Sequence, residues 1–419
     1  MLPRLALMAE TAPVENWGTD YDIFDPDYVN DPAPVWDELR GRCPIAHTER
    51  WGGSFLPTRY DDVQALAKMV PELSSGDPLV TTPPPEIIEE LLADPVFEKY
   101  GANAAPISED PPIHGWTRRL LLPHFTVKAV QAHRQYTVDL ANSLIDGFID
   151  EGTVDGAGQY AQQIPPRVIA HLMGVDESRV DDFTYWVQCI LELGLSDIEL
   201  RLKYRKVIRD YFREVVEDKQ ANPDDGFVSA LLAGTDDEGE SIDPMRVVGM
   251  LNLQLIAGID TTWSSIGSAL WHFGTHPADR ERMLAEPELW PSAIEELLRF
   301  YSPVTMGRRA SEDVECNGVT IPQGSKVLMN FPAANRDPET FERPDEVILD
   351  RPHNRHIAFG AGIHRCAGSN LARLEMDIAL RTWFERIPDF EVSEPDQVTW
   401  AGGQVRGPRF LPIRFPSAG

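Results

Sequence analysis

Hydrophobic residues recur at three- and four-residue spacing over much of the chain, which is the pattern of amphipathic helices. The spacing predicts helices over residues 127–149, 176–195, 198–219, 227–233, 291–301 and 367–387. In residues 244–275 the apolar positions surround the helix, so we expect it to be buried on most sides. Gly258 lies near its centre, where glycine costs ~1 kcal/mol relative to alanine. It indicates either tight packing or a close approach to the backbone.

Shorter runs with β-like composition occur at residues 53–60, 319–321 and 326–329 and near the C-terminus. Proline-rich residues 78–112 read as a long loop with one short helix, a composition typical of a binding loop. No internal repeat, low-complexity tract or change in composition divides the chain. We therefore expect a mainly α fold with a small β region, a single domain over residues 1–419, with residues 1–20 flexible.

Charge and cysteine content exclude several classes of protein. The chain has 38 Lys and Arg against 67 Asp and Glu, a net charge of −29, which repels nucleic acid and anionic membranes. No apolar run is long enough for a signal peptide or a membrane span. The four cysteines lack the spacing of a zinc site or a disulfide framework. We expect a soluble, cytoplasmic monomer that binds neither nucleic acid nor membrane.

One segment stands out chemically: Phe359-Gly-Ala-Gly-Ile-His-Arg-Cys-Ala-Gly368, directly before a predicted helix. A cysteine at a helix N-terminus is favoured as the thiolate by the helix dipole and by free N–H groups. The glycines before it allow the backbone to approach a planar group closely. These features suit a metal-bound thiolate, although a lone cysteine is more often a buried apolar group.

In its six fixed positions this segment resembles the heme-binding loop of the cytochrome P450 superfamily, F-G-x-G-x-H-x-C-x-G. The resemblance implies that Cys366 is the axial ligand of heme b and that Phe359 lies at the cofactor. It also implies a monooxygenase that inserts one atom of dioxygen into a hydrophobic organic substrate. Further motifs in the family's order support this interpretation.

Glu296 and Arg299 form an E-x-x-R motif, with both side chains on one helix face. Such a pair is commonly a weak surface ion pair. The resemblance instead implies a buried structural pair behind the heme. Arg343 is the candidate third member, although the family's usual Pro-x-Arg is not matched there.

Residues Ala257-Gly-Ile-Asp-Thr-Thr262 resemble the family's A-G-x-D/E-T-T motif in the long buried helix. The resemblance implies that Ala257 and Gly258 approach the cofactor, with Gly258 letting the helix bulge. It also implies that Asp260 and Thr261 deliver protons during oxygen activation. The alternative is a solvent-facing Asp260, with Thr261 hydrogen-bonded to the preceding turn.

Residues Asp110-Pro-Pro-Ile-His-Gly-Trp-Thr-Arg118 resemble a further motif of the family, D-P-P-x-H-x-x-x-R. His114 and Arg118 are four residues apart, so both can face one anion. The resemblance makes that anion a heme propionate, with Arg308 and His364 completing the site and Arg309 as the competitor of Arg308. Each of these residues could otherwise be a solvated surface residue.

The substrate pocket can be outlined from the same resemblance. Besides Ala257 and Thr261, we expect it to be lined by Leu253, Ile256, Val304, Thr305 and Met306. Simple core packing is the alternative for each. The outline contains no charged residue and favours a small or medium apolar substrate. A basic group from residues 78–106 or 186–195 would redirect this choice to an acid.

No fused flavin or iron–sulfur module is evident, so we expect electrons from a separate ferredoxin with its reductase. Candidates for the docking surface near Cys366 are Arg119, Lys128, Arg134, Arg365 and Arg373. Two alternatives remain at this point. One is a peroxide-driven or C–C coupling oxidase on the same fold, and the other is a non-catalytic heme sensor or carrier.

Overall fold

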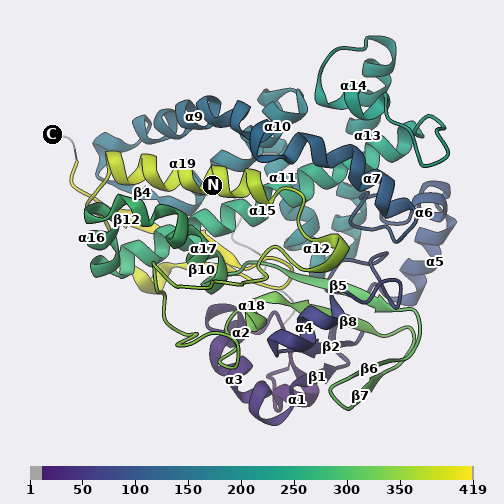
Figure 1. Ribbon diagram of the computed structural model, residues 1–419, viewed down its shortest axis with the longest axis horizontal. Helices are drawn as coiled ribbons and strands as arrows, with labels where there is room; N and C mark the ends of the chain where they lie inside the picture. Colours follow the sequence, from purple (N-terminus) through teal and green to yellow (C-terminus); the bar gives the residue numbers. More distant parts are fainter. Residues whose placement is uncertain (1–11, 418–419) are drawn as a thin grey trace.

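The computed structural model describes residues 12–417. A five-stranded sheet lies at one end of the molecule with several short helices (Figure 1). Its spatial order is β1 (Ile45–Thr48), β2 (Ser54–Pro57), β8 (Lys326–Asn330), β5 (Thr305–Ala310) and β3 (Leu73–Ser74). Strand β2 runs parallel to β8, and the other neighbours are antiparallel. The helices of this end are α1 (Trp17–Asp20), α2 (Pro26–Asn30), α3 (Ala33–Arg42), α4 (Tyr60–Leu66) and α18 (Phe331–Ala334).

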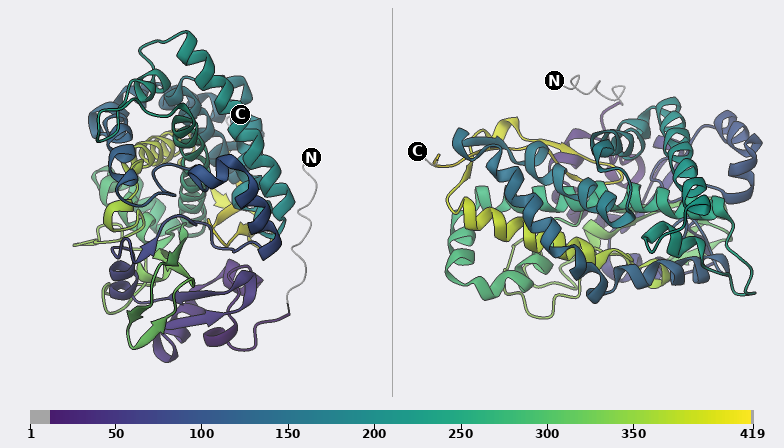
Figure 2. Two further views of the ribbon diagram at one scale, coloured as in Figure 1. Left: turned by 90° about the vertical axis from the view of Figure 1, so that its right-hand side faces the viewer. Right: turned by 90° about the horizontal axis from the view of Figure 1, so that it is seen from above.

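The larger part of the molecule is helical and is organised around α15 (Pro244–Thr275) (Figures 1 and 2). Helix α15 contacts α10 (Ile164–Met173), α11 (Val180–Leu191), α13 (Ile198–Ala221) and α19 (Ser369–Arg386). The remaining helices are α5 (Pro85–Ala93), α6 (Pro95–Tyr100), α7 (Ile113–Leu121), α8 (Val127–Val130), α9 (Arg134–Asp146), α12 (Leu193–Ser196), α14 (Phe227–Leu232), α16 (Pro277–Ala285) and α17 (Trp290–Phe300). Most of α15 is buried, as its all-round apolar pattern predicted.

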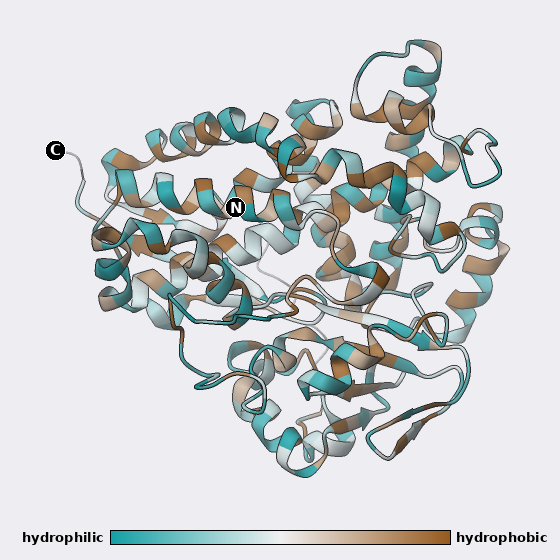
Figure 3. Cartoon of the chain, in the orientation of Figure 1, coloured by the Kyte–Doolittle hydropathy of each residue, from teal (hydrophilic) through white to brown (hydrophobic). Residues whose placement is uncertain are grey.

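Three small sheets complete the fold. They consist of the hairpin β6 (Val314–Cys316) and β7 (Val319–Ile321), the pair β10 (Thr399–Ala401) and β11 (Gly407–Phe410), and the set β4 (Thr153–Asp155), β12 (Pro412–Arg414) and β9 (Glu391–Val392). Apolar and polar residues alternate along α9 and α19, as Figure 3 shows. The main core joins α9, α10, α15, α17 and α19.

The predicted mainly α fold with a small β region is confirmed. The expected flexibility of residues 1–20 stays a prediction. Residues 1–11 lie outside the described range, and residues 12–20 contain the short helix α1. No helix within residues 12–417 combines the length and apolar character that a membrane crossing requires.

Candidate active site

The cysteine loop lies between α18 and α19 and is closed by its own backbone. The N–H of Cys366 donates to the carbonyl oxygen of Phe359 at 2.8 Å. Gly360 and Gly362 have φ angles of 73° and 72°, a conformation that L-residues rarely adopt. A Cβ on Gly362 would lie 2.8 Å from the carbonyl oxygen of Ala67, at the end of α4. The two glycines are therefore needed to bring the cysteine to this position.

Cys366 presents an accessible thiol just before α19. The surrounding protein raises the pKa of this thiol through desolvation. A hydrogen bond from the Gly368 backbone and the charges of Arg118, Arg365 and Arg373 act in the opposite direction and favour the thiolate. The other cysteines within residues 12–417 are buried or half-buried. Cys366 is thus the cysteine placed to bind a ligand.

Basic side chains from three separate segments meet beside the cysteine loop. The rings of His114, on α7, and His364 have centroids 4.2 Å apart. Desolvation lowers the pKa of His364 to about 2, and the charges of Arg308, His114 and Arg118 add to the effect. Arg118 donates to the carbonyl oxygen of Arg365, which joins α7 to the loop. The structure thus brings together the four residues predicted to bind an anion.

This cluster has buried polar atoms without a partner. Within the described range, Nε2 of His114, Nε2 of His364 and Nε of Arg308 have no hydrogen-bond acceptor or donor. Buried polar groups are normally paired, and buried cations require an anion. A porphyrin that carries two carboxylates fits this arrangement. Arg309 instead pairs with Asp77 at 2.6 Å, which favours Arg308 for the predicted role.

Helix α15 presents Ala257 and Thr261 to a cavity of about 490 Å³. The helix is continuous through Gly258, so the expected bulge is not observed. A Cβ at Gly258 would approach Cδ1 of Ile169 to 3.1 Å, so packing against α10 accounts for this glycine. The hydroxyl of Thr261 donates to the carbonyl oxygen of Ala257 at 2.9 Å. This is the bond to the preceding turn that the alternative interpretation foresaw.

Asp260 is buried, so the alternative of a solvent-facing carboxylate is wrong. It accepts hydrogen bonds from Arg409 Nη2 at 2.8 Å and from Ser264 Oγ at 3.3 Å. Arg409, on β11, also donates to Glu192 at 2.7 Å. Burial raises the pKa of Asp260 to about 6, although the charge of Arg409 opposes the rise. Sequence reasoning missed Arg409 and Glu192, which are remote from the motif and match no pattern.

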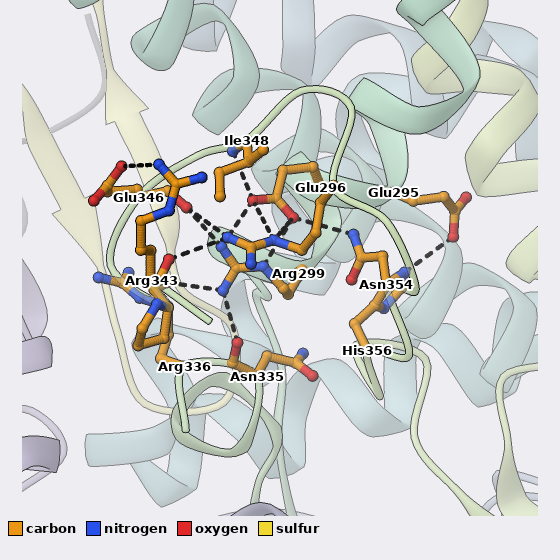
Figure 4. Close-up of polar contacts among 12 residues, drawn as sticks. Glu295, Glu296, Arg299, Asn335, Arg336, Arg343, Glu346, Ile348, Asn354 and His356 are labelled. Carbon is orange, nitrogen blue, oxygen red and sulfur yellow. Dashed lines mark hydrogen bonds and ion pairs between the residues drawn. The ribbon is translucent and has the colours of Figure 1, made fainter. Parts of the chain in front are cut away.

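Glu296 and Arg299 form a buried pair, with both side chains 0% exposed. Arg299 donates to both carboxylate oxygens at 2.8 and 2.9 Å, and it also binds the carbonyl oxygens of Asn335, Pro344 and Glu346 (Figure 4). The suggestion of Arg343 as third member is wrong. That position belongs to Arg351, whose Nε lies 2.9 Å from Glu296 Oε2.

Arg343 instead forms an exposed ion pair with Glu346 at 3.1 Å. The segment that contains Arg343 nonetheless contributes to the network through its backbone, because Arg351 donates to the carbonyl oxygen of Arg343. The network therefore fixes the chain that leads to the cysteine loop.

The cavity wall agrees with the predicted outline at Leu253, Ile256, Val304 and Met306. Thr305 does not line the cavity, so its predicted place in the wall is wrong. Successive residues of an extended segment face opposite sides, so Val304 and Met306 face the cavity while Thr305 faces away from it. Sequence reasoning also missed the charged residues in the wall, namely Asp77, Arg201, Arg205 and Arg309.

Comparisons with known proteins agree with this geometry. Residues 278–400 match the family model "Cytochrome P450". The chain is 35% identical to the vitamin D(3) 25-hydroxylase of Pseudonocardia autotrophica, over 90% of this chain and 91% of the relative. It is 34% identical to the 6-deoxyerythronolide B hydroxylase of Saccharopolyspora erythraea, over 91% and 95% respectively. The crystal structure of the myxobacterial cytochrome P450 CYP267B1, in complex with myristic acid, has a TM-score of 0.83 and 29% identity, covering 94% of this chain and 98% of that one.

Proposed function

This chain belongs to the cytochrome P450 family, and on that premise we propose that it hydroxylates a hydrophobic organic molecule with electrons from a separate ferredoxin and its reductase. The enzyme is a monooxygenase, and its cofactor is heme b. When bound, the heme activates dioxygen so that one oxygen atom enters a C–H bond and the other leaves as water. The relatives named for vitamin D(3) and 6-deoxyerythronolide B support a hydrophobic substrate.

The observation that carries the proposal is the accessible thiol of Cys366 beside unpaired basic side chains. Cys366 would bind the iron. Four side chains would bind the two propionates of the heme: His114, Arg118, Arg308 and His364. Two further residues would border the ring, namely Ala257, which lines the cavity, and Phe359, whose carbonyl oxygen accepts from the N–H of Cys366, whereas Gly258 packs against α10. Glu296 and Arg299 would hold the loop that precedes the ligand.

Asp260 and Thr261 are adjacent on α15, and we assign them the delivery of protons to the cavity. Asp260 connects through Arg409 to Glu192, whose side chain is 15% exposed, so the network leads from the interior towards solvent. Thr261 lines the cavity, and its hydroxyl oxygen can accept a hydrogen bond while it donates to Ala257. Thr261 can therefore hold a proton where the substrate binds, while Asp260, whose carboxyl group faces Arg409 and Ser264, would hold one behind the cavity wall.

Replacing Thr261 by alanine is expected to uncouple electron use from product formation. Because a positioned proton donor contributes ~10² or more to such a step, the product formed per NADH should fall at least ~10-fold. Electron consumption should continue, and hydrogen peroxide should accumulate. Parallel assays of NADH, product and peroxide measure this. Thr261→Ser keeps the hydroxyl and should stay coupled, whereas full coupling in Thr261→Ala would remove Thr261 from the mechanism.

The raised pKa of Asp260, about 6, predicts a pH dependence of coupling. Below this value the carboxyl group is protonated and can donate, and above it the protonated fraction falls tenfold per pH unit. Product formed per NADH is therefore expected to decrease as the pH rises from 5.5 to 8. Asp260→Asn should give a low and flat profile over the same range. A wild-type profile that is equally flat would exclude Asp260 as the titrating donor.

The electron donor is expected to dock over Cys366. Of the five candidate cations, three are engaged in ion pairs: Arg119 with Asp237, Arg134 with Asp377 and Arg373 with Glu295. Lys128 and Arg365 are exposed and form no ion pair within residues 12–417. We assign the docking surface to these two and propose that the enzyme acts as a single-domain monomer in the cytoplasm. The surface would attract the acidic face of a ferredoxin.

The test is turnover by the purified holoenzyme with NADH, a ferredoxin and its reductase, against a panel of hydrophobic molecules. Hydroxylated product that requires all three components supports the proposal. Product formed only when hydrogen peroxide replaces them would favour the peroxide-driven alternative. Absence of product from either route, in a protein with a normal heme spectrum, would contradict the proposed activity.

A further inference from the structure

Helix α13 contributes two cations to the wall of the substrate cavity. Arg201 and Arg205 both line it, and they lie four residues apart on successive turns of one helix face. The side chain of Arg201 is only 4% exposed, so it is not a surface charge that merely extends towards solvent. Two arginine side chains therefore border a space that is otherwise mostly apolar.

In the part of the chain that the structure describes, neither guanidinium has a carboxylate within ion-pair distance. Arg201 Nη1 donates to Thr81 Oγ1 at 3.1 Å, and Arg205 Nη2 donates to the carbonyl oxygen of Ala102 at 3.2 Å. Neither arginine forms an ion pair within residues 12–417. Arg205 also stacks over the ring of Phe97, with 5.4 Å between the guanidinium carbon and the ring centroid.

Within residues 12–417, the one carboxylate of the cavity wall compensates these charges only in part. Asp77 is held by two other cations, Lys326 at 2.8 Å and Arg309 at 2.6 Å. These three groups already carry one surplus positive charge before Arg201 and Arg205 are added. The wall is therefore strongly positive, in a protein whose overall charge is −29.

This arrangement is unfavourable in the protein alone. Buried charges are costly without a counter-charge, and like charges four residues apart on a helix repel. Desolvation is the main cause that lowers the pKa of Arg205 to about 10, so Arg205 stays protonated at neutral pH. The charges of Arg201 and Arg209 add to this shift, and those of Asp94 and Asp77 oppose it. A negatively charged group between Arg201 and Arg205 would remove both costs. Guanidinium groups bind carboxylates with two parallel hydrogen bonds, which suits such a site.

We infer that the substrate is a hydrophobic carboxylic acid whose carboxylate binds between Arg201 and Arg205. This rests on the proposed function and replaces the expectation of a neutral apolar substrate. The rest of the cavity suits the hydrophobic body of such a molecule, with a wall that includes Leu91, Ile190, Leu191, Leu253, Ile256 and Val304. Anchoring the carboxylate on α13 would hold one end of the substrate and restrict which carbon atoms reach Ala257 and Thr261.

The test is optical titration of the ferric holoenzyme with matched acid and neutral ligands. Dodecanoic acid is compared with 1-dodecanol, and 4-pentylbenzoic acid with pentylbenzene, each followed by the change in heme spin state. The wild type should bind each acid about 10-fold or more tightly than its neutral counterpart, since hydrogen bonds to charged groups are the stronger ones. Dodecyl phosphate, with the same chain, tests whether the site prefers a different anion.

Substitutions then assign the preference to residues. Arg201→Gln and Arg205→Gln should each weaken acid binding about 10-fold and leave binding of the alcohol and of pentylbenzene unchanged. Lys203→Gln is the matched control, because Lys203 is exposed on the same helix and does not line the cavity. This substitution makes the same change of charge and should leave the affinity for acids and for neutral ligands unchanged.

Three results would overturn the inference. They are equal affinity for acid and neutral ligands in the wild type, an equal loss of both classes in the arginine variants, and tighter binding of dodecyl phosphate than of dodecanoic acid. The wild-type comparison decides the matter even where a variant fails to fold. If neutral ligands shift the spin state and the protein shows no preference for acids, this inference alone is contradicted. A protein without a heme spectrum would contradict the proposed function as well.

Discussion

Cys366→His is expected to abolish hydroxylation while leaving a folded protein. The thiolate donates electron density that favours O–O cleavage, which imidazole does not supply to the same degree. The basic cluster of His114, Arg308 and His364 is unchanged in this variant, so heme should still bind. The ferrous carbon monoxide complex should lose the red-shifted absorption band of thiolate-ligated heme. Product formation should fall below detection.

Cys43→Ser is the matched control for this substitution. Cys43 lies at the end of α3, and its thiol contacts the carbonyl oxygen of Ile45 at 3.4 Å, away from the cysteine loop. Its removal should leave both the spectrum and turnover unchanged. A Cys366→His enzyme that retained turnover, or the loss of the thiolate band in Cys43→Ser, would contradict the assignment of the ligand.

Glu296→Gln is expected to cause the largest loss of stability. The carboxylate accepts hydrogen bonds from Arg299, Arg351, Asn354 and the backbone N–H of Ile348, and it is wholly buried. Removing its charge leaves two buried guanidinium groups without a carboxylate, which costs about 3–5 kcal/mol. For a chain of this length we expect thermal heme release about 4–5 °C lower than in the wild type.

Glu346→Gln makes the same chemical change a short distance away and serves as the control. It breaks the exposed pair with Arg343, in which the side chains are 59% and 56% exposed, so its effect should be within about 0.5 kcal/mol. Thermal release of heme, followed by its absorption, measures both variants. Equal effects of the two substitutions would contradict the buried network as the support of the cysteine loop.

The strongly periodic helices could be predicted from the sequence, and those interrupted by polar residues or proline could not. The predicted bounds of residues 244–275 are those of α15, because an apolar segment of 32 residues is too long for a strand and favours a buried helix. Helix α16 was missed, since five of its nine residues are charged or proline. Helix α10 begins Ile164-Pro-Pro, which reads as a loop although proline is tolerated in a first helical turn. Its later residues are held by packing on α15.

Site residues within a local motif could be predicted from the sequence. Site residues that contact the motif from distant parts of the sequence could not. Cys366 and Thr261 stand in spacings that carry their own chemistry. Arg351 and Arg409 act through contacts with residues 55 and 149 positions away, and no sequence pattern marks them. The inward position of Arg201 could not be predicted either. Helix α13 carries many charged residues, and helical spacing alone does not tell which of them face inwards. The choice between an apolar and an acidic substrate therefore required the structure.

The most direct measurement is turnover under labelled dioxygen, ¹⁸O₂, with whichever ligand of the panel shifts the heme spin state. Mass spectrometry of the product should show one ¹⁸O atom per hydroxyl group introduced. No label should enter the product from H₂¹⁸O under unlabelled dioxygen. Product that takes its oxygen from water, or that forms equally without dioxygen, would contradict a monooxygenase built on Cys366 and the proton donors of α15.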